Sequence, residues 1–232
     1  MEIDLNADLG EGVGTDDAIV PLITSANICC GAHAGDDETI RNTFAHAKSW
    51  GVAVGAHPGY ADRVNFGRVN IVEPTEDLVK ELTRQVKHFQ QIAKEMDVPV
   101  RYIKPHGALY NQAASDERFA RIVCELANAA RLPIVGLPES EVESASLLAG
   151  TPFYTEGFAD RRYNPDGTLV PRSEPNALLG DVADVVAQVQ WLVNTLRVRT
   201  ICVHGDTPGA VALIAAVRDE MLKTGFTLKA FA

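Results

Sequence analysis

Cysteine is scarce in this sequence of 232 residues, and no two cysteines form a CxxC pair. The four cysteines lie in the apolar runs NICC, RIVCEL and TICVHG, at positions Cys29, Cys30, Cys124 and Cys202. This spacing argues against a disulfide framework and against a cysteine-based zinc site. We therefore expect four small buried thiols in a reducing compartment.

Long apolar runs and basic runs are also missing. No apolar run reaches the roughly 18 residues of a membrane-spanning helix, and the first residues show no basic region followed by an apolar core and a cleavage site. The net charge is -10 without an offsetting basic run, which argues against nucleic acid or an anionic membrane as a partner. We expect a cytoplasmic protein that binds neither nucleic acid nor membrane.

Two nucleotide-binding signatures are absent as well. The sequence contains neither the P-loop pattern GxxxxGK[ST] nor a Gly-rich dinucleotide fingerprint. If the protein uses a nucleotide, the phosphates are therefore bound in another way or on another chain.

The pattern that is present alternates short apolar runs with longer helical segments. The strand-like runs are IDLNAD, SANICC, VAVGAH, VRYIKPH, LPIVGL, PFYTEGF and RTICVHG. Helical patterns cover about 38–50, a segment capped by Thr75, a segment capped by Ser115, about 139–148, 180–196, and a last segment that follows Pro208 and ends before Gly225. Strands that alternate with helices predict a parallel sheet built from βαβ units.

The composition, 46% hydrophobic and 22% charged, is that of an ordinary globular protein. No change in composition marks a domain boundary, so we predict one domain over residues 1–232. The leading architecture is a closed or nearly closed (β/α) barrel with about seven strands, and an open doubly wound sheet is the second choice.

The first strand carries an unusual polar face. In DLNADLGEG, residues Asp4, Asn6 and Asp8 alternate with Leu5, Ala7 and Leu9, which is the period of a β-strand. Such a face can meet water, form a buried polar network, or help to build a reaction site. The two buried arrangements need partners elsewhere in the chain, because unpaired buried carboxylates are costly.

Polar residues collect after the strands, and four of the six histidines do so beside Gly or Pro. Any one of these histidines is well explained as a core residue, but their joint placement indicates a site, because barrels and open α/β sheets build sites at the carboxyl ends of strands. Candidates for the reaction itself are Asp8, His33, His57, Lys104, His106, Glu156 and His204. Candidates for binding a substrate are Asn6, Arg68, Asn111, Asp160, Arg161, Tyr163, Arg172 and Asp206.

One group among these candidates has two readings. Asp8, His33 and His57 could hold a divalent metal ion with an open position. The same three side chains could instead act as general acid and base without a metal. Both possibilities remain open from the sequence.

Eight motifs in this order resemble the LamB/YcsF family over essentially the whole chain. They are DLNADLGEG, ANICCGAHAGD, GAHPGY, FGR, KPHGALYN, EGFADRRY, GTLVPR and CVHGDTP. Two positions depart from the family pattern: Ala32 stands where the family often has Phe, and Val69 stands where it often has a second Arg. A role for position 69 is therefore not carried over, whereas Arg68 is retained.

The resemblance implies a distorted (β/α) barrel of seven strands, similar to deacetylase barrels. It also implies an activity that opens the lactam of 5-oxo-L-proline to L-glutamate and is coupled to ATP hydrolysis. Family members work with partner proteins, the 5-oxoprolinase subunits B and C, and a homo-oligomer is also possible. Where ATP binds is not implied.

The chemistry of a lactam suggests roles for the candidate residues. Asp8, with His33 and His57, would activate water or hold a metal, and Lys104 with His106 would stabilise charge on the activated oxygen. Arg161 or Arg68 would bind a carboxylate or a phosphate. The residues that would orient and protonate are Glu156, Asp160, Tyr163, His204 and Asp206.

Two alternatives belong to other classes. The first is a metal-dependent amide hydrolase or deacetylase that acts without ATP. The second is a non-catalytic subunit that binds and delivers 5-oxoproline.

Overall fold

Seven parallel strands close into a barrel in the computed structural model, which describes residues 1–172, 174–206 and 209–232. Strand β1 pairs with β2 on one side and with β7 on the other, so the sheet has no free edge at this point. The seven strands are β1 (Glu2–Leu9), β2 (Ser25–Cys29), β3 (Ala53–His57), β4 (Val100–Ile103), β5 (Ile134–Gly136), β6 (Phe153–Phe158) and β7 (Thr200–Cys202). The closed barrel predicted from the sequence is confirmed, and the open sheet is excluded.

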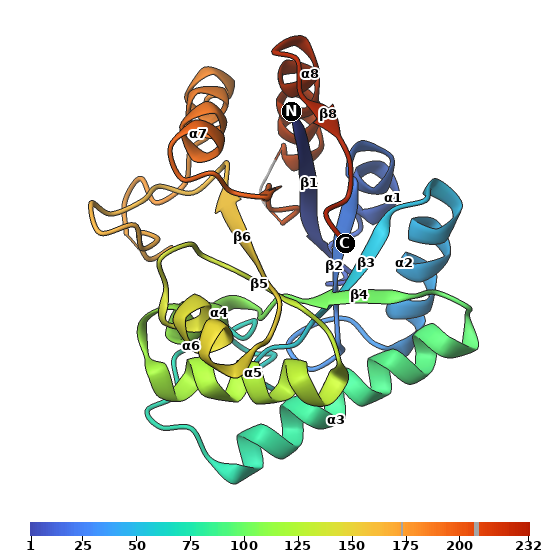
Figure 1. Cartoon of the computed structure of the whole chain (residues 1–232). Helices are drawn as coiled ribbons and strands as arrows, with labels where there is room; N and C mark the ends of the chain where they lie inside the picture. Colours follow the sequence, from blue (N-terminus) through green and yellow to red (C-terminus); the bar gives the residue numbers. More distant parts are fainter. Residues whose placement is uncertain (173, 207–208) are drawn as a thin grey trace.

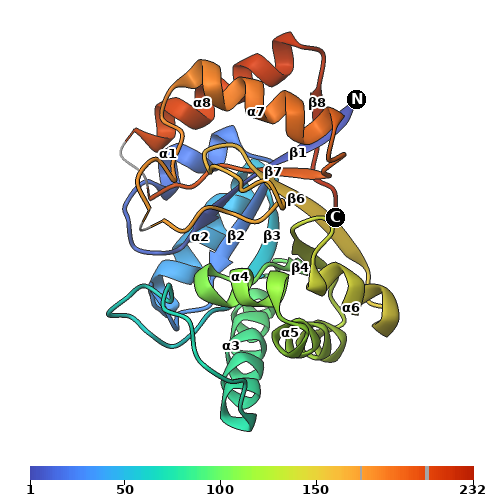
Figure 2. The ribbon, with the colours of Figure 1, turned by 90° about the vertical axis from the view of Figure 1, so that its left-hand side faces the viewer.

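Helices surround the strands on the outside (Figures 1 and 2). They are α1 (Asp16–Ile19), the 3-10 turn η1 (Val20–Leu22), α2 (Asp37–Trp50), α3 (Glu76–Glu95), α4 (Gly107–Ser115), α5 (Glu117–Ala130), α6 (Glu141–Ala149), α7 (Val182–Asn194) and α8 (Ala210–Lys223). None of the helices in the described part of the chain combines the length and the hydropathy needed to cross a membrane.

Most predicted elements are confirmed, with differences at three places. Thr75 caps α3 as expected, by accepting a hydrogen bond from the Leu78 amide (3.1 Å). The predicted cap at Ser115 is wrong: Ser115 ends α4, and Asp116 caps α5 because its carboxylate accepts from the Arg118 amide. Helix α4 and the short strand β8 (Thr227–Leu228) were not predicted, and Thr207 and Pro208 of the CVHGDTP motif lie outside the described residues.

The two faces of β1 point to different environments. Leu5, Ala7 and Leu9 belong to the main apolar core cluster. The polar residues of the same strand point to the inside of the barrel, where Asp4 accepts from Ser25 (2.6 Å) and Asn6 donates to Glu156 (3.0 Å). The polar face of the first strand is therefore not solvated but forms the centre of a buried network.

Space inside the barrel is limited, and Gly55 on β3 illustrates it. A Cβ atom at this position would lie 2.1 Å from the ring of Tyr102, which is fully buried. The Tyr102 hydroxyl donates to Asn27 Oδ1 (2.7 Å), so the ring links β4 to the polar interior. Gly55 is thus required by the close approach of an aromatic ring from the neighbouring strand.

Candidate active site

A cavity of about 920 Å³ opens at the carboxyl ends of the strands. Its lining includes Asp8 from β1, His57 from β3 and the residues that follow β4, β6 and β7. This is the end at which (β/α) barrels build their active sites. The long connections after β3 and β6 supply the outer part of the lining.

The centre of the site is a buried lysine held between two carboxylates. Lys104 Nζ lies 3.0 Å from Asp8 Oδ1 and 2.9 Å from Glu156 Oε1, and all three side chains are at most 9% exposed. Burial alone would lower the pKa of Lys104, but Asp8 and its other neighbours raise it well above its usual value. Lys104 is therefore a permanent cation next to the cavity.

Asp8 is held as a carboxylate by its neighbours. Burial raises the pKa of this group, but His57 and Lys104 outweigh that effect and lower the pKa well below its usual range. Asn27 also donates to Asp8 Oδ1 (2.8 Å). In Glu156, by contrast, burial dominates over Lys104 and raises the pKa.

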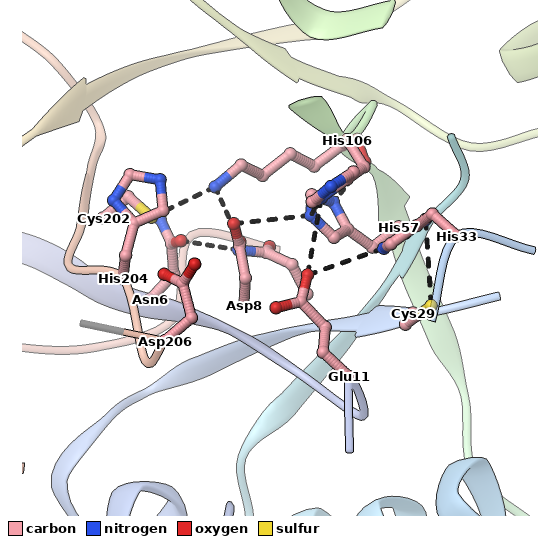
Figure 3. A network of polar contacts seen from close by, with 12 residues as sticks. Asn6, Asp8, Glu11, Cys29, His33, His57, His106, Cys202, His204 and Asp206 are labelled. Carbon is pink, nitrogen blue, oxygen red and sulfur yellow. Dashed lines mark hydrogen bonds and ion pairs between the residues drawn. The ribbon is translucent and has the colours of Figure 1, made fainter. Parts of the chain in front are cut away.

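Two imidazole rings meet edge to face beside Asp8 (Figure 3). His57 Nδ1 donates to the backbone carbonyl of Lys104 (2.7 Å), and His106 Nε2 donates to the backbone carbonyl of Phe66 (2.9 Å). Their remaining nitrogens, His57 Nε2 and His106 Nδ1, face each other at 3.0 Å. Burial lowers the pKa of both rings, so each is predominantly neutral.

Glu11 and His33 complete this side of the site. Glu11 Oε1 lies 3.4 Å from His106 Nδ1 and 3.5 Å from His33 Nε2, and the His33 ring stacks on His106 at 3.7 Å between centroids. Neither Glu11 Oε1 nor His33 Nε2 has a hydrogen-bond partner within the described residues. Burial and the nearby charges of Asp8 and Asp206 raise the pKa of Glu11 well above its usual value.

The FGR motif holds the histidines in place through its backbone. Gly67 has a φ of +63°, and a Cβ atom there would lie 3.0 Å from His33 Cβ and 3.1 Å from His106 Cδ2. Glycine is suited to this position because it tolerates the positive φ and leaves room for both rings. The preceding residue, Phe66, supplies the carbonyl that receives the His106 proton.

Arginines form another wall of the cavity. Arg68 and Arg172 both pair with Asp206, whose pKa is lowered because the two guanidinium groups outweigh burial. Arg161 is buried and donates to the Val170 carbonyl (2.6 Å), while its Nε has no hydrogen-bond partner among the described residues. Burial, helped by Arg172, lowers the pKa of Arg161 to about 10. This wall is suited to an anionic group of a ligand.

His204 faces the cavity from the end of β7. Its Nδ1 lies 2.9 Å from Asp160 Oδ1, and its ring stacks on Phe158 at 5.3 Å. The charge and hydrogen bonds of His204 lower the pKa of Asp160 although burial opposes them. Asp160 thus fixes the orientation of the His204 ring.

The structure brings the predicted residues together in two layers. Those that line the cavity are Asp8, His57, Arg68, Lys104, His106, Asn111, Arg161, Arg172 and His204. Those that contact the lining from behind are Asn6, His33, Glu156, Asp160 and Asp206. Tyr163 plays a different part, since its hydroxyl accepts from the Phe158 amide (2.7 Å) and supports the end of β6.

Sequence reasoning left Glu11, Cys202 and Asn27 out of the site. Glu11 follows the first strand directly, but nothing in its sequence context distinguishes it from a surface glutamate. Cys202 lies 3.1 Å from Lys104 Nζ, and Asn27 bridges Asn6 and Asp8. An apolar run around Cys202 and a single amide at position 27 gave no signal. All four cysteines are buried and free, as predicted.

Two groups of side chains have the donor atoms for a metal ion. The first is Asp8, Glu11, His57 and His106, and the second is Asp8, Cys202 and His204. The first differs from the predicted set because Glu11 and His106 join Asp8 and His57, while His33 lies behind them. The cavity thus offers water-binding carboxylates and imidazoles, one fixed ammonium group and an arginine wall, which is a set suited to acid–base or metal-assisted attack on a carbonyl.

Comparisons with known proteins agree over the whole length. The A subunit of the 5-oxoprolinase of Neisseria meningitidis serogroup C is 42% identical, covering 99% of each chain. The A subunit of the 5-oxoprolinase of Paracidovorax citrulli is 44% identical over 100% of each chain.

Solved structures give the same picture of the fold. The lactam utilization protein from Thermus thermophilus superposes with a TM-score of 0.91 at 34% identity, with 100% of both chains covered. A family 4 carbohydrate esterase from Streptomyces lividans gives a TM-score of 0.53 at 11% identity, covering 100% of this chain and 93% of the other, which shows a shared barrel architecture. The model of the LamB/YcsF family matches residues 3–232, and the chain therefore belongs to the LamB/YcsF family.

Proposed function

We propose that this chain is the lactam-opening component of an ATP-dependent 5-oxoprolinase, which converts 5-oxo-L-proline to L-glutamate. The observation that carries this proposal is the combination in one cavity of Asp8, paired with Lys104 and His57, and an arginine wall. The names of the full-length relatives, the A subunit of 5-oxoprolinase and lactam utilization protein, support the same substrate.

The substrate explains why ATP is needed. A five-membered lactam is a resonance-stabilised amide, and water attacks it slowly. Phosphorylation of the amide oxygen makes the ring carbon a better electrophile. Water then adds to this carbon, the C–N bond breaks with a proton going to nitrogen, and a second water releases inorganic phosphate from the new carboxyl group.

The residues have matching positions for these steps. Asp8, His57 and His106 hold and deprotonate the attacking water, and the Lys104 ammonium group opposes negative charge that develops on the carbonyl oxygen. The arginine wall binds the substrate carboxylate or the phosphoryl group. His204, oriented by Asp160, supplies the proton to the leaving nitrogen.

ATP is assigned to the partner proteins. The sequence has no P-loop, and the family works with subunits B and C. The cavity of about 920 Å³ has room for a lactam that already carries a phosphoryl group. In this scheme subunits B and C activate the lactam and the present chain opens it.

Reconstitution tests the proposed function. Glutamate release from 5-oxo-L-proline is measured with and without ATP, first for the chain alone and then with subunits B and C of the same organism. We expect ATP-dependent glutamate only in the mixture. Glutamate from the chain alone without ATP would instead support an independent amide hydrolase, and no glutamate in any combination of folded proteins would contradict the proposal.

A further inference from the structure

The hydrogen bonds of His57 and His106 leave two lone pairs directed at each other. Each ring donates its only proton, in the neutral form, to a backbone carbonyl: His57 to Lys104 and His106 to Phe66. The facing nitrogens, His57 Nε2 and His106 Nδ1, are 3.0 Å apart. Two lone pairs at this distance repel each other unless a positive charge lies between them or beside them.

Two carboxylate oxygens point to the same place (Figure 3). Asp8 Oδ2 lies 3.4 Å from His57 Nε2, and Glu11 Oε1 lies 3.4 Å from His106 Nδ1. The four ligand atoms lie within 4.8 Å of one another. Glu11 Oε1 is buried and has no hydrogen-bond partner in the described part of the chain, so it is aimed at this point without a visible reason.

The spacing of these atoms suits a bound ion. A tetrahedral zinc ion with ligand bonds of about 2.0–2.1 Å places its ligand atoms about 3.3 Å apart. The three measured neighbour distances, 3.4, 3.0 and 3.4 Å, lie around this value. The carbonyls that receive the outer N–H groups of both rings are also typical of histidines that bind a metal.

We propose that Asp8, Glu11, His57 and His106 bind one divalent transition-metal ion, with zinc as the best match to two imidazoles and two carboxylates. The binding site stands independently of the lactam reaction proposed above. His33, which stacks on His106 and lies 3.5 Å from Glu11, is a positioning residue behind the ligands. A metal ion here would act as a Lewis acid towards water or a carbonyl oxygen in the cavity.

A shared proton or a different ligand set fits the geometry less well. A proton shared by the two rings would relieve their lone pairs, but it would leave Glu11 Oε1 without a partner. The second possible group, Asp8 with Cys202 and His204, already faces a cation, because Lys104 Nζ lies 3.0 Å from Asp8 Oδ1 and 3.1 Å from Cys202 Sγ. The first group is therefore the better site.

The experiment measures metal binding by the full chain, prepared without an affinity tag and stripped with a chelator. Co²⁺ is the probe, because its absorption in the visible range reports on the ligand geometry, and zinc is then added in competition. We expect one equivalent of Co²⁺ with a tetrahedral or five-coordinate spectrum, displaced by one equivalent of zinc. Absence of saturable binding would overturn the proposal.

Matched variants locate the ion. Glu11→Gln and His106→Gln should weaken binding by more than the about 10–100-fold that is typical of outer-shell changes. His88→Gln, on the exposed surface of α3, and His204→Gln, in the second group, should bind as the unaltered chain does. Loss of binding in His204→Gln but not in His106→Gln would overturn the assignment, and circular dichroism checks that every variant is folded.

Discussion

At the scale of single residues, the polar face of β1 is explained by the partners that it meets inside the barrel. Asp4 accepts hydrogen bonds from Thr24, Ser25 and Thr200, one layer below the site. Asp8, one layer above Asn6, reaches Lys104 and the cavity. The same alternation that buries Leu5 and Leu9 outside the barrel thus carries charge to its centre.

Replacing Lys104 tests how strongly this centre depends on one cation. Lys104→Met keeps most of the side-chain length but leaves Asp8 and Glu156 buried without their ion-pair partner. We expect the free energy of unfolding in urea to fall by about 3–5 kcal/mol, as for other broken buried ion pairs. Lys87→Met on the exposed side of α3 is the control and should stay within about 0.5 kcal/mol. Equal stability of the two variants would contradict the ion-pair description.

Asp4 makes stability depend on pH in an unusual direction. Burial raises its pKa from 3.8 to about 6, against the hydrogen bonds from its neighbours. The folded state therefore binds a proton between these values that the unfolded state releases, and stability falls as the pH rises from about 4 to 6. The size of this effect is roughly 3 kcal/mol, at about 1.4 kcal/mol for each pKa unit.

The Asp4→Asn variant isolates this contribution from other titrating groups. We expect the stability of the unaltered chain, relative to Asp4→Asn, to be greatest near pH 4 and to decline by up to roughly 3 kcal/mol by pH 7. Urea unfolding at a series of pH values measures the difference. A difference that is constant over this range would show that the pKa of Asp4 is not raised.

At the scale of elements, the loops after the strands hold the site. The loop after β3 carries FGR back over the histidines, and α4 brings Asn111 to the cavity directly after β4. Helix α4 was missed because its residues follow the KPH segment without a break and its N-terminal residue, Gly107, has a φ of +53° rather than a side-chain cap. Strand β8 was missed because two residues give no periodicity.

A pair of glycine variants tests whether the FGR loop positions the rings. Both Gly67 and Gly14 have positive φ, but only at Gly67 would an added Cβ atom have neighbours within 4 Å, namely the two imidazole side chains and the Tyr60 carbonyl. We expect Gly67→Ala to cost about 1–3 kcal/mol more than Gly14→Ala in urea unfolding, because crowding adds to the shared backbone strain. It should also lower glutamate release, whereas Gly14→Ala should not. Equal costs would remove the crowding argument.

At the scale of the whole molecule, the barrel was predictable because alternation of strands and helices recurs along the chain. The positions of the polar residues after each strand also predicted which end of the barrel carries the site. The division between lining and supporting residues was not predictable, because it depends on barrel closure. His33 and His57, for example, follow similar strands, yet only His57 faces the cavity.

The charge of Asp8 is the most direct test of the whole account. The rate of glutamate release is compared between complexes of subunits B and C with the unaltered chain, with Asp8→Asn, and with Asp219→Asn as an exposed control. We predict that Asp8→Asn lowers the rate by about 10²–10⁴-fold without loss of folding or of complex assembly, as expected for removal of an acid–base group, and that Asp219→Asn has no effect. An Asp8→Asn complex that releases glutamate at the unaltered rate would contradict a catalytic site at the carboxyl end of β1 and would leave this chain as a subunit that only binds the substrate.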